Sequence, residues 1–394
     1  MKRRIRFDRW DGEADFGTGD HDGTEVADGR LALGAPTGIC GYDDPHRDGP
    51  PVKYDRATWT SAELTPGFGF TELVASWNAH TPEGTWIEVA LQVRTARATS
   101  GWLVMGRWAE SDADIAPTSV PGQSDEVAAV HVDRLTLPET APGTSYRMRV
   151  TLLRRTGTAA TPAVSLLGCV ASAVPPGAPV VSAERNGAAG TVLEVPAYSQ
   201  RLHLGSYPQW ANGGESWCSP TATSMVLAHW GLGPRKLDYA WVDPGMADPV
   251  VPYAARHTFD HDYRAPGNWS FNAAYAARFG AVAFVTRLRS LAEAELFVSA
   301  GIPLVVGVAF TRDQLDGAGY DTTGHLAVLV GFDDDGNVVC NDPASHEIAS
   351  NDEVRATFDR AQFERAWMRS SGGITYVIAP PDVPLPPAPA EPNW

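Results

Sequence analysis

The feature that most constrains the fold is a change in hydrophobic periodicity part-way along the chain. Before about residue 175, apolar and polar residues alternate in short runs, for example at 87–93 and 146–152, and clusters of Gly, Pro, Asp and Ser separate these runs. A period of two is typical of half-buried strands, and many short strands predict a β-sandwich or a jelly roll. We therefore expect residues 1–175 to form an all-β accessory domain.

The remainder of the chain has a different pattern. Residues 176–192 are rich in Pro, Gly and Ala and predict a linker. Residues 193–380 predict an α+β domain with helices in front and antiparallel strands behind. Its expected helices are one beginning near Cys218 and others at 271–278, 290–301 and 358–368, and its expected strands are 191–200, 302–310, 325–332, 338–341 and 373–379. The proline-rich residues 381–394 predict an extended, poorly packed tail.

Composition excludes several classes of function. The formal net charge of −16 argues against binding to nucleic acid or to anionic membranes. No apolar run is long enough for a transmembrane segment, and the basic N-terminus is not followed by the apolar core of a signal peptide. Four cysteines, at 40, 169, 218 and 340, are too few for a disulfide scaffold. A bridge between Cys40 and Cys169 remains an alternative to plain buried thiols.

Residues 213–231 deliver one cysteine, Cys218, to the first turn of a predicted buried helix. The apolar residues of this helix share one face: Ala222, Met225, Val226 and Trp230. Pro220 fits the first turn and Gly231 ends the helix. The unpaired N–H groups and the positive end of the helix dipole favour a thiolate at this position. The alternative is a small apolar residue packed under a helix.

The predicted hairpin between residues 325 and 342 supplies the two further groups that a thiolate nucleophile needs. A base must reach the thiol, and a third group must orient the base. His325 begins the first strand and Asp342 follows the end of the second, so antiparallel pairing makes them neighbours. The carboxylate would fix the imidazole tautomer and stabilise an imidazolium paired with Cys218. Taken singly, His325 is also an ordinary strand-end histidine, and Asp342 an ordinary turn residue before proline.

Gln200 is the candidate donor to a tetrahedral oxyanion. It stands at the end of the strand predicted over 191–200, eighteen residues before Cys218. Its side-chain amide and the backbone N–H of Cys218 would together provide two donors. The alternative is a surface amide without a catalytic role.

Four motifs carry a resemblance to a known family: 195–200 (VPAYSQ), 217–221 (WCSPT), 324–332 (GHLAVLVGF) and 341–344 (NDPA). Over about residues 193–380 the chain resembles the bacteriocin-processing-peptidase-like branch of the papain-like cysteine peptidases. The resemblance implies that Cys218 is the nucleophile, His325 the general base and acid, Asp342 the orienting carboxylate and Gln200 the oxyanion donor. Trp217, Gly214 and Gly324 are expected to bind substrate. It also suggests secretion, although no leader is visible.

The chain departs from this family in two ways. The family usually has glycine directly after the cysteine, where this chain has Ser219, which is expected to alter the loop shape and substrate clearance. There is also no attached transporter, since membrane spans and an ATP-binding loop are missing. Cleavage of an exported leader is therefore not implied.

The front region resembles the β-sandwiches found beside such peptidases in actinobacterial-type proteins. Its six tryptophans, at 10, 59, 77, 86, 102 and 108, are interpreted mainly as core residues, with sugar stacking on an open face as the alternative. The polar segment 256–262 contains two histidines and two aspartates but lacks the ligand spacing of a zinc site, which favours a loop flanking the cleft.

These observations predict a cysteine peptidase that hydrolyses peptide or related amide bonds of a peptide or protein substrate through an acyl-thioenzyme, without metal or organic cofactor. One alternative is acyl transfer of the transglutaminase type, which uses the same order of nucleophile, base and carboxylate. The other is a glycan-binding or cell-wall-binding protein with a degenerate peptidase domain, in which the sandwich makes the contact.

Overall fold

The computed structural model describes residues 3–175 and 184–394, and their contacts divide the chain into two compact units. The N-terminal unit consists of residues 6–173 and 259–264. The C-terminal unit consists of the described residues of 1–5, 174–258 and 265–394. The linker predicted at 176–192 lies partly outside the described residues, and its described part, 184–192, contains neither a helix nor a regular strand.

The N-terminal unit is built almost entirely from strands, with one short helix, α1 (Gly12–Phe16). The strands in chain order are β1 (Arg4–Asp11), β2 (Asp20–Asp22), β3 (Thr24–Ala27), β4 (Arg30–Leu33), β5 (Gly38–Tyr42), β6 (Val52–Thr60), β7 (Glu72–His80), β8 (Thr85–Thr95), β9 (Leu103–Trp108), β10 (Ala129–His131), β11 (Arg134–Thr136), β12 (Gly143–Arg155) and β13 (Ala163–Ala173). The alternating runs at 87–93 and 146–152 lie within β8 and β12, as predicted. The short strands before residue 43 were not predicted.

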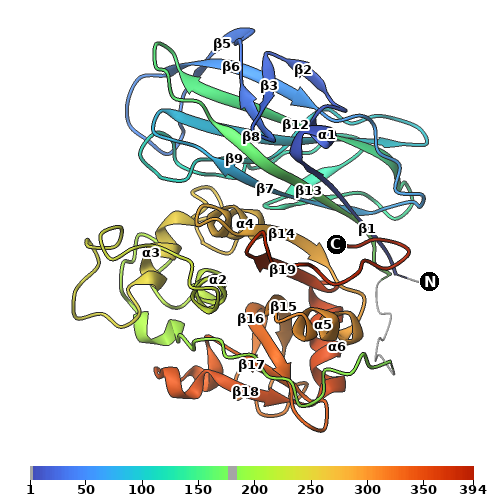
Figure 1. Cartoon of the computed structure of the whole chain (residues 1–394), viewed down its shortest axis with the longest axis vertical. Helices are drawn as coiled ribbons and strands as arrows, with labels where there is room; N and C mark the ends of the chain where they lie inside the picture. The colour runs from blue at the N-terminus through green and yellow to red at the C-terminus, as the bar shows by residue number, and fades with distance from the viewer. Residues whose placement is uncertain (1–2, 176–183) are drawn as a thin grey trace. The chain divides into compact units, whose positions relative to one another are not determined.

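These strands form two sheets that face each other (Figure 1). One sheet has the order β10-β11-β7-β13-β4-β3, with β1 also paired to β13, and the other has the order β2-β6-β12-β8-β9, with β5 paired to β6. Five of the six front tryptophans are buried between or beside the sheets, as predicted, because large aromatic rings supply much of a sandwich core. Trp102 is the exception and is partly exposed.

The C-terminal unit places short helices before an antiparallel sheet. Its elements are η1 (Gln200–His203), α2 (Cys218–His229), α3 (Val250–His257), α4 (Trp269–Ala277), β14 (Val282–Arg287), α5 (Leu291–Ser299), β15 (Leu304–Phe310), β16 (Thr322–Phe332), β17 (Val338–Asn341), η2 (Ser345–Glu347), η3 (Asn351–Glu353), β18 (Arg355–Phe358), α6 (Arg360–Ser370) and β19 (Ile374–Ala379). The sheet order is β14-β19-β15-β16-β17-β18. None of the helices in the described ranges combines the length and hydropathy required to cross a bilayer.

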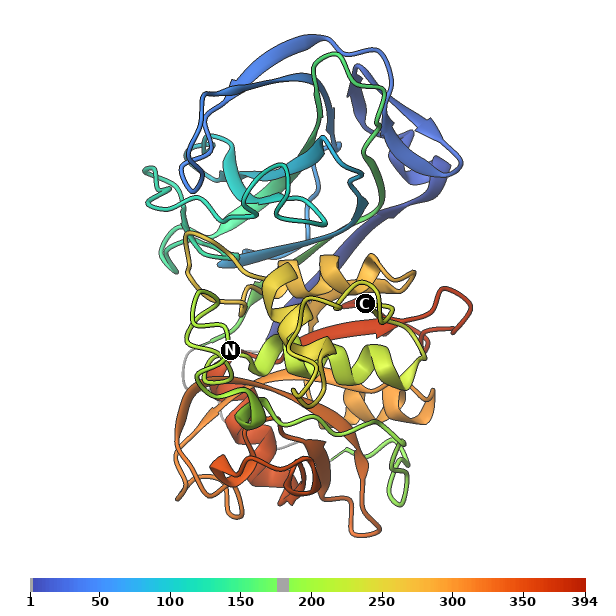
Figure 2. The same ribbon diagram turned by 90° about the vertical axis from the view of Figure 1, so that its left-hand side faces the viewer.

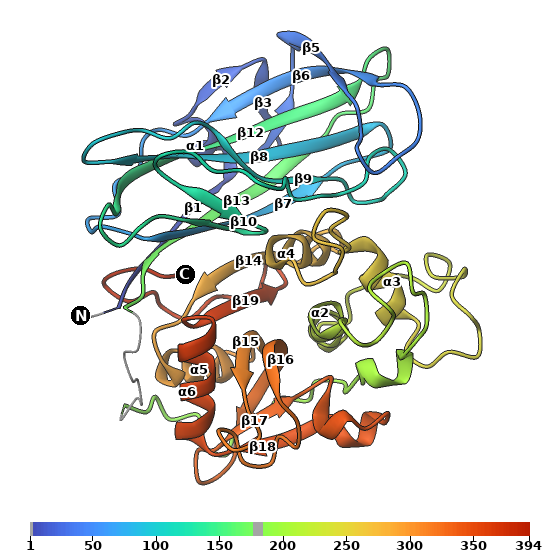
Figure 3. The same cartoon turned by 180° about the vertical axis from the view of Figure 1, so that it is seen from behind.

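Helices cover both faces of the central strands β15 and β16, which explains why these strands are apolar along nearly their whole length. Figure 3 shows α2 on one side of β15 and β16 and α5 and α6 on the other. The helices α2, α3 and α4 pack against one another as a group (Figure 2). Helix α2 therefore packs against α3 and α4 on one side and against strand β16 on the other.

Two predictions for this unit are wrong. Residues 191–200 do not form a strand: only Val192 bridges to Gly331, since Pro196 has no N–H for a ladder and Gln200 already begins η1. The tail is not poorly packed at its end. Asn393 is fully buried and donates from Nδ2 to the Arg287 carbonyl at 2.8 Å and to Glu293 at 2.9 Å.

Candidate active site

Cys218 is the first residue of α2, where the sequence placed it. The side chain is partly buried, and the preceding residue, Trp217, does not cap the helix with a side-chain hydrogen bond. The first N–H groups of a helix have no partner inside the helix, so they remain available to stabilise negative charge at this end. Pro220 lies in the first turn, and Gly231 follows the helix with a φ of 67°.

His325 and Asp342 meet at the neighbouring ends of β16 and β17, as the predicted hairpin required. Val328 pairs with Asn341, so the chain beyond Asn341 runs back beside His325. The His325 Nε2 atom lies 2.6 Å from Asp342 Oδ1, and both side chains are buried. The imidazole and the Cys218 thiol also shift each other's pKa, and since Nε2 is engaged by Asp342, Nδ1 is the ring nitrogen left for the thiol.

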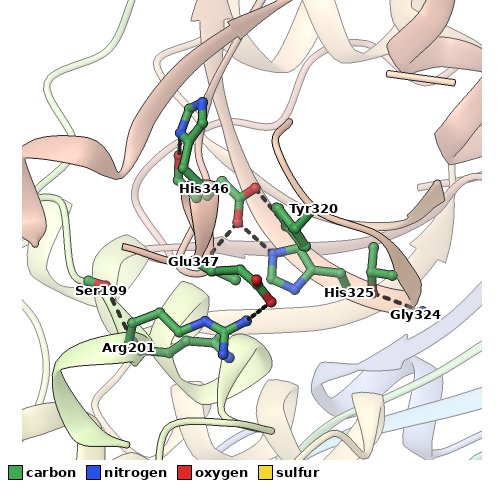
Figure 4. Close-up of polar contacts among 12 residues, drawn as sticks. Ser199, Arg201, Tyr320, Gly324, His325, His346 and Glu347 are labelled. Carbon is green, nitrogen blue, oxygen red and sulfur yellow. Dashed lines mark hydrogen bonds and ion pairs between the residues drawn. The ribbon is translucent and has the colours of Figure 1, made fainter. Parts of the chain in front are cut away.

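Tyr320, which the sequence analysis did not single out, completes the environment of Asp342. Its hydroxyl donates to Asp342 Oδ2 at 2.8 Å, and the backbone N–H of Ala344 donates to Oδ1 at 2.9 Å. Figure 4 shows Tyr320 and His325 converging on this carboxylate. Tyr320 lies in a loop before β16, without a periodic or motif signal that could have marked it.

The charges of these groups depend on one another. Burial raises the pKa of the Cys218 thiol, but the hydrogen bond and charge of His325 and the backbone N–H groups of Leu326 and Ser219 outweigh it, so the pKa is lowered. Burial opposes the charge of His325, yet Asp342 and Cys218 raise its pKa to about 10. Burial also opposes ionisation of Asp342, but His325, Tyr320 and Ala344 lower its pKa. The arrangement favours a thiolate–imidazolium pair beside an ionised carboxylate.

Gln200 lies close to the nucleophile loop but is already engaged. It is buried, and its Nε2 donates to the carbonyls of Gly214 at 2.7 Å and Glu215 at 3.0 Å. The opposite orientation of the amide would place Oε1 against those two carbonyl oxygens, so repulsion fixes this one. Within the described residues Oε1 has no hydrogen-bond partner. The structure thus places Gln200 under the loop that leads to Cys218.

Two contacts fasten η1 to the segment that follows Asp342. The backbone N–H of Gln200 donates to the Pro343 carbonyl at 2.9 Å, and Arg201 forms an ion pair with Glu347 at 3.0 Å (Figure 4). Gly331 allows the preceding chain to approach β16, because an added Cβ there would lie 2.2 Å from the Thr191 carbonyl oxygen. The oxyanion candidate and the His325–Asp342 pair are therefore held in one framework.

The three residues predicted to bind substrate have different surroundings. Trp217 is fully buried beside Val251, Ala255 and the His203 ring. Its Nε1 donates to the Trp210 carbonyl at 2.6 Å. The prediction that Trp217 binds substrate is therefore corrected: the residue packs in the core. Gly214 has a φ of 32°, and an added Cβ would lie 2.3 Å from the Gln200 carbonyl oxygen. Gly324 is exposed, and a Cβ there would meet no atom within 4 Å.

Comparison with known proteins assigns both parts of the chain. Residues 6–172 match the family model of the Peptidase C39 N-terminal domain, and residues 192–374 match that of the Peptidase_C39 like family. Residues 192–374 thus belong to the Peptidase_C39 like family, and residues 6–172 to the N-terminal domain family that accompanies it in name. The sequence resemblance is thereby confirmed, including its front domain.

Among solved structures, the chain matches the crystal structure of a C39-like peptidase candidate from Bacillus anthracis. The two are 20% identical, the match covers 48% of this chain and 97% of the other, and the TM-score is 0.30. The comparison with curated proteins found no match.

The serine that follows Cys218 points into the interior. Ser219 is fully buried, and its hydroxyl lies 3.0 Å from the hydroxyl of Tyr376 on β19. The side chain is therefore satisfied by the sheet. This contact links the first turn of α2 to the core and removes the expected effect of Ser219 on substrate clearance.

The polar segment 256–262 is divided between the two units. Residues 259–264 belong to the N-terminal unit, where Asp260 accepts from the Ser119 N–H at 2.9 Å and His261 contacts the Pro117 carbonyl at 3.0 Å. The described parts of the chain contain no cluster of three or more metal-ligating side chains. All four cysteines are free thiols, which excludes a Cys40–Cys169 bridge in this structure.

Proposed function

We propose that the C-terminal unit is a papain-like cysteine peptidase that hydrolyses peptide or related amide bonds, with Cys218 as nucleophile. The observation that carries this proposal is the His325 imidazole, which lies 2.6 Å from Asp342 Oδ1 and whose pKa is raised by both Asp342 and Cys218. Helices from the first half of the unit pack on an antiparallel sheet from the second half, and the nucleophile begins the central helix. This order of elements supports the papain-like assignment.

The reaction would proceed in two stages. The Cys218 thiolate attacks the carbonyl carbon of the scissile bond, and the carbonyl oxygen becomes the oxyanion. The protonated His325 gives its proton to the leaving nitrogen, the C–N bond breaks, and an acyl-thioenzyme remains. A water molecule then loses a proton to His325 and attacks the thioester, which releases the carboxylic acid and restores the thiolate. Asp342 stays ionised and keeps the imidazole oriented.

The oxyanion donors in this proposal are the backbone N–H of Cys218 and one N–H of Gln200. Because both Gln200 donors are engaged, donation to the oxyanion requires release of the longer bond, the one to the Glu215 carbonyl at 3.0 Å. The exchange replaces a neutral acceptor with a charged one, which forms a stronger hydrogen bond. Gly214 and Gly324 remain the residues proposed to leave room for the substrate backbone.

The direct test is the rate of iodoacetamide labelling at Cys218 as a function of pH, followed by mass spectrometry of the labelled peptide. Cys40 is an internal control, since it is also partly buried but burial raises its pKa. We expect Cys218 to stay reactive well below the free-thiol pKa of about 8.5, and this reactivity to be lost in His325→Ala. If Cys218 titrates as Cys40 does, the ion pair and the proposed mechanism are wrong.

Activity is then measured as new N-termini released from a denatured casein digest, with Cys218→Ala as the inactive control. Hydrolysis by the wild type alone supports the peptidase assignment. Isopeptide bonds to an added primary amine, formed in place of new N-termini, would assign acyl transfer instead.

A further inference from the structure

A cleft of about 610 Å³ opens on one sheet of the N-terminal unit, and the proposed peptidase chemistry does not use it. Alternate residues of the central strands β6 and β12 form its floor: Arg56, Thr58, Thr60, Arg147, Arg149 and Thr151. The residues between them are buried in the core, among them Ala57, Trp59, Met148 and Val150. One face of this sheet therefore closes the sandwich, while the other presents polar side chains in a concave site.

The arginines of this cleft differ in how they are paired. Arg107 forms an ion pair with Glu88 at 2.9 Å, and Arg147 forms one with Asp20 at 2.9 Å. By contrast, neither Arg56 nor Arg149 forms an ion pair or a side-chain hydrogen bond within the described residues. Two guanidinium groups thus face the cleft with open donors.

Arg149 is also held in place. Its guanidinium carbon lies 4.4 Å from the centroid of the Trp102 ring, a stacked arrangement that arginine favours. Burial lowers the pKa of Arg149. The charge of Glu88 raises this pKa, and the charge of Arg56 lowers it further. A carboxylate bound between the two arginines would relieve this repulsion and form charge-assisted, bidentate hydrogen bonds.

The rest of the lining suits a ligand with many hydroxyl groups. Tyr42 and Trp86 form an aromatic pair with ring centroids 4.8 Å apart, and threonine hydroxyls lie along the floor. The carboxylates of Asp20, Asp22 and Glu88 can accept hydrogen bonds from ligand hydroxyls. Apolar ring faces combined with donors and acceptors are the usual content of a built small-molecule site.

We propose that this cleft binds an acidic saccharide, with a sugar carboxylate on Arg149 and Arg56 and sugar hydroxyls on the threonines and carboxylates. A phosphate polymer fits less well, because its phosphates offer no hydrogen-bond donor to the carboxylates of Asp20, Asp22 and Glu88, whereas sugar hydroxyls do. A peptide strand fits less well too, because the floor strands are paired on both sides and offer no free sheet edge. This site is independent of Cys218 and of the proposed peptidase function.

The test is calorimetric titration of the full chain with a panel of carboxylated saccharides: oligogalacturonate, hyaluronan oligosaccharide and a disaccharide containing N-acetylmuramic acid. Neutral oligosaccharides of the same length serve as control ligands. We expect at least one acidic saccharide to bind roughly tenfold more tightly than its neutral counterpart, and Arg149→Gln to remove that advantage. Trp102→Ala is expected to weaken binding several-fold, roughly as loss of one stacking contact does.

Arg30→Gln is the control variant, since Arg30 is exposed on β4 of the other sheet and should bind as the wild type does. Melting curves of all variants exclude unfolding as the cause of any loss. The proposal is overturned if no acidic saccharide is preferred over its neutral counterpart, or if Arg149→Gln and Arg30→Gln bind equally. It is also overturned if oligothymidylate or polyphosphate binds in an Arg149-dependent manner and the saccharides do not, which would make the cleft a general phosphate site.

Discussion

The candidate active site and the arginine-lined cleft satisfy their charged groups in opposite ways. In the C-terminal unit, Asp342 bonds both His325 and Tyr320, and His325 lowers the pKa of Asp342 and of Cys218 against the effect of burial. In the N-terminal unit, Arg56 and Arg149 face a cleft without a carboxylate partner from the described chain. In the proposed peptidase site the polar groups satisfy one another, whereas in the proposed saccharide site a ligand would complete the hydrogen bonds. Substitutions should therefore have different consequences in the two places.

The largest effect is expected from Asp342→Asn. The amide keeps the shape of the side chain but cannot stabilise the His325 imidazolium, so the thiolate loses its counter-ion. We expect kcat/KM for peptide hydrolysis to fall by between about a hundredfold and ten-thousandfold. The pH profile of Cys218 labelling should move toward that of Cys40. An unchanged profile would show that Asp342 does not act through His325.

The same substitution should affect stability in a pH-dependent manner. The folded pKa of His325, about 10, exceeds the ordinary value of about 6.5, so the stabilisation by its charge is complete below pH 6.5 and is lost as the pH rises toward 10. Asp342 has a lowered pKa, so its contribution is lost as the pH falls below about 3.9. Urea unfolding of wild type and Asp342→Asn should therefore differ most near pH 5–6, by about 3 kcal/mol, and the two should converge at alkaline pH.

Tyr320→Phe should have a smaller effect. It removes one of the hydrogen bonds to Asp342 without adding a charge, so we expect a loss of about 1–2 kcal/mol in the free energy of unfolding. If Tyr320 positions the carboxylate, kcat should fall several-fold while KM is unchanged, and the labelling pKa of Cys218 should rise. Equal effects from Tyr263→Phe, in an exposed loop, would indicate a non-specific cause.

The smallest effect is expected from Arg149→Gln. Arg149 forms no ion pair in the described part of the chain, and the glutamine loses only its stacking on Trp102, so the free energy of unfolding should change by less than about 1 kcal/mol. The rate of Cys218 labelling should match that of the wild type. A large loss of stability would show that the cleft is a structural network like the active site, and would remove the contrast between the two.

The sequence predicted the active site better than the cleft for a physical reason. His325 and Asp342 lie at neighbouring ends of two consecutive antiparallel strands, so local pairing is enough to bring them together. Tyr320 could not be found this way, because its contact depends on the path of an irregular loop. The engagement of Gln200 by the Gly214 carbonyl depends on the same kind of path.

The cleft depends on strands that are distant in sequence. The alternation along β6 and β12 predicted that one face would be polar, but not that Arg56 and Arg149 would line a cleft without forming an ion pair in the described part of the chain. Trp102 shows the same limit. The sequence could not tell which of the six tryptophans would be exposed; the structure shows that Trp102 is partly exposed and the other five are buried.

The division of the chain into units has a consequence for cutting and exchanging them. The first residues of the chain belong to the C-terminal unit, and the N-terminal unit is inserted after them. Residues 259–264, which lie within the sequence of the C-terminal unit, belong to the N-terminal unit. A fragment starting at residue 174 would lose the bond from Arg3 to the Met368 carbonyl at 2.9 Å, and residues 259–264 would lose Ser119. Neither unit is a contiguous segment of the gene. Recombination at a single junction would therefore transfer an incomplete unit, which favours inheritance of the two together.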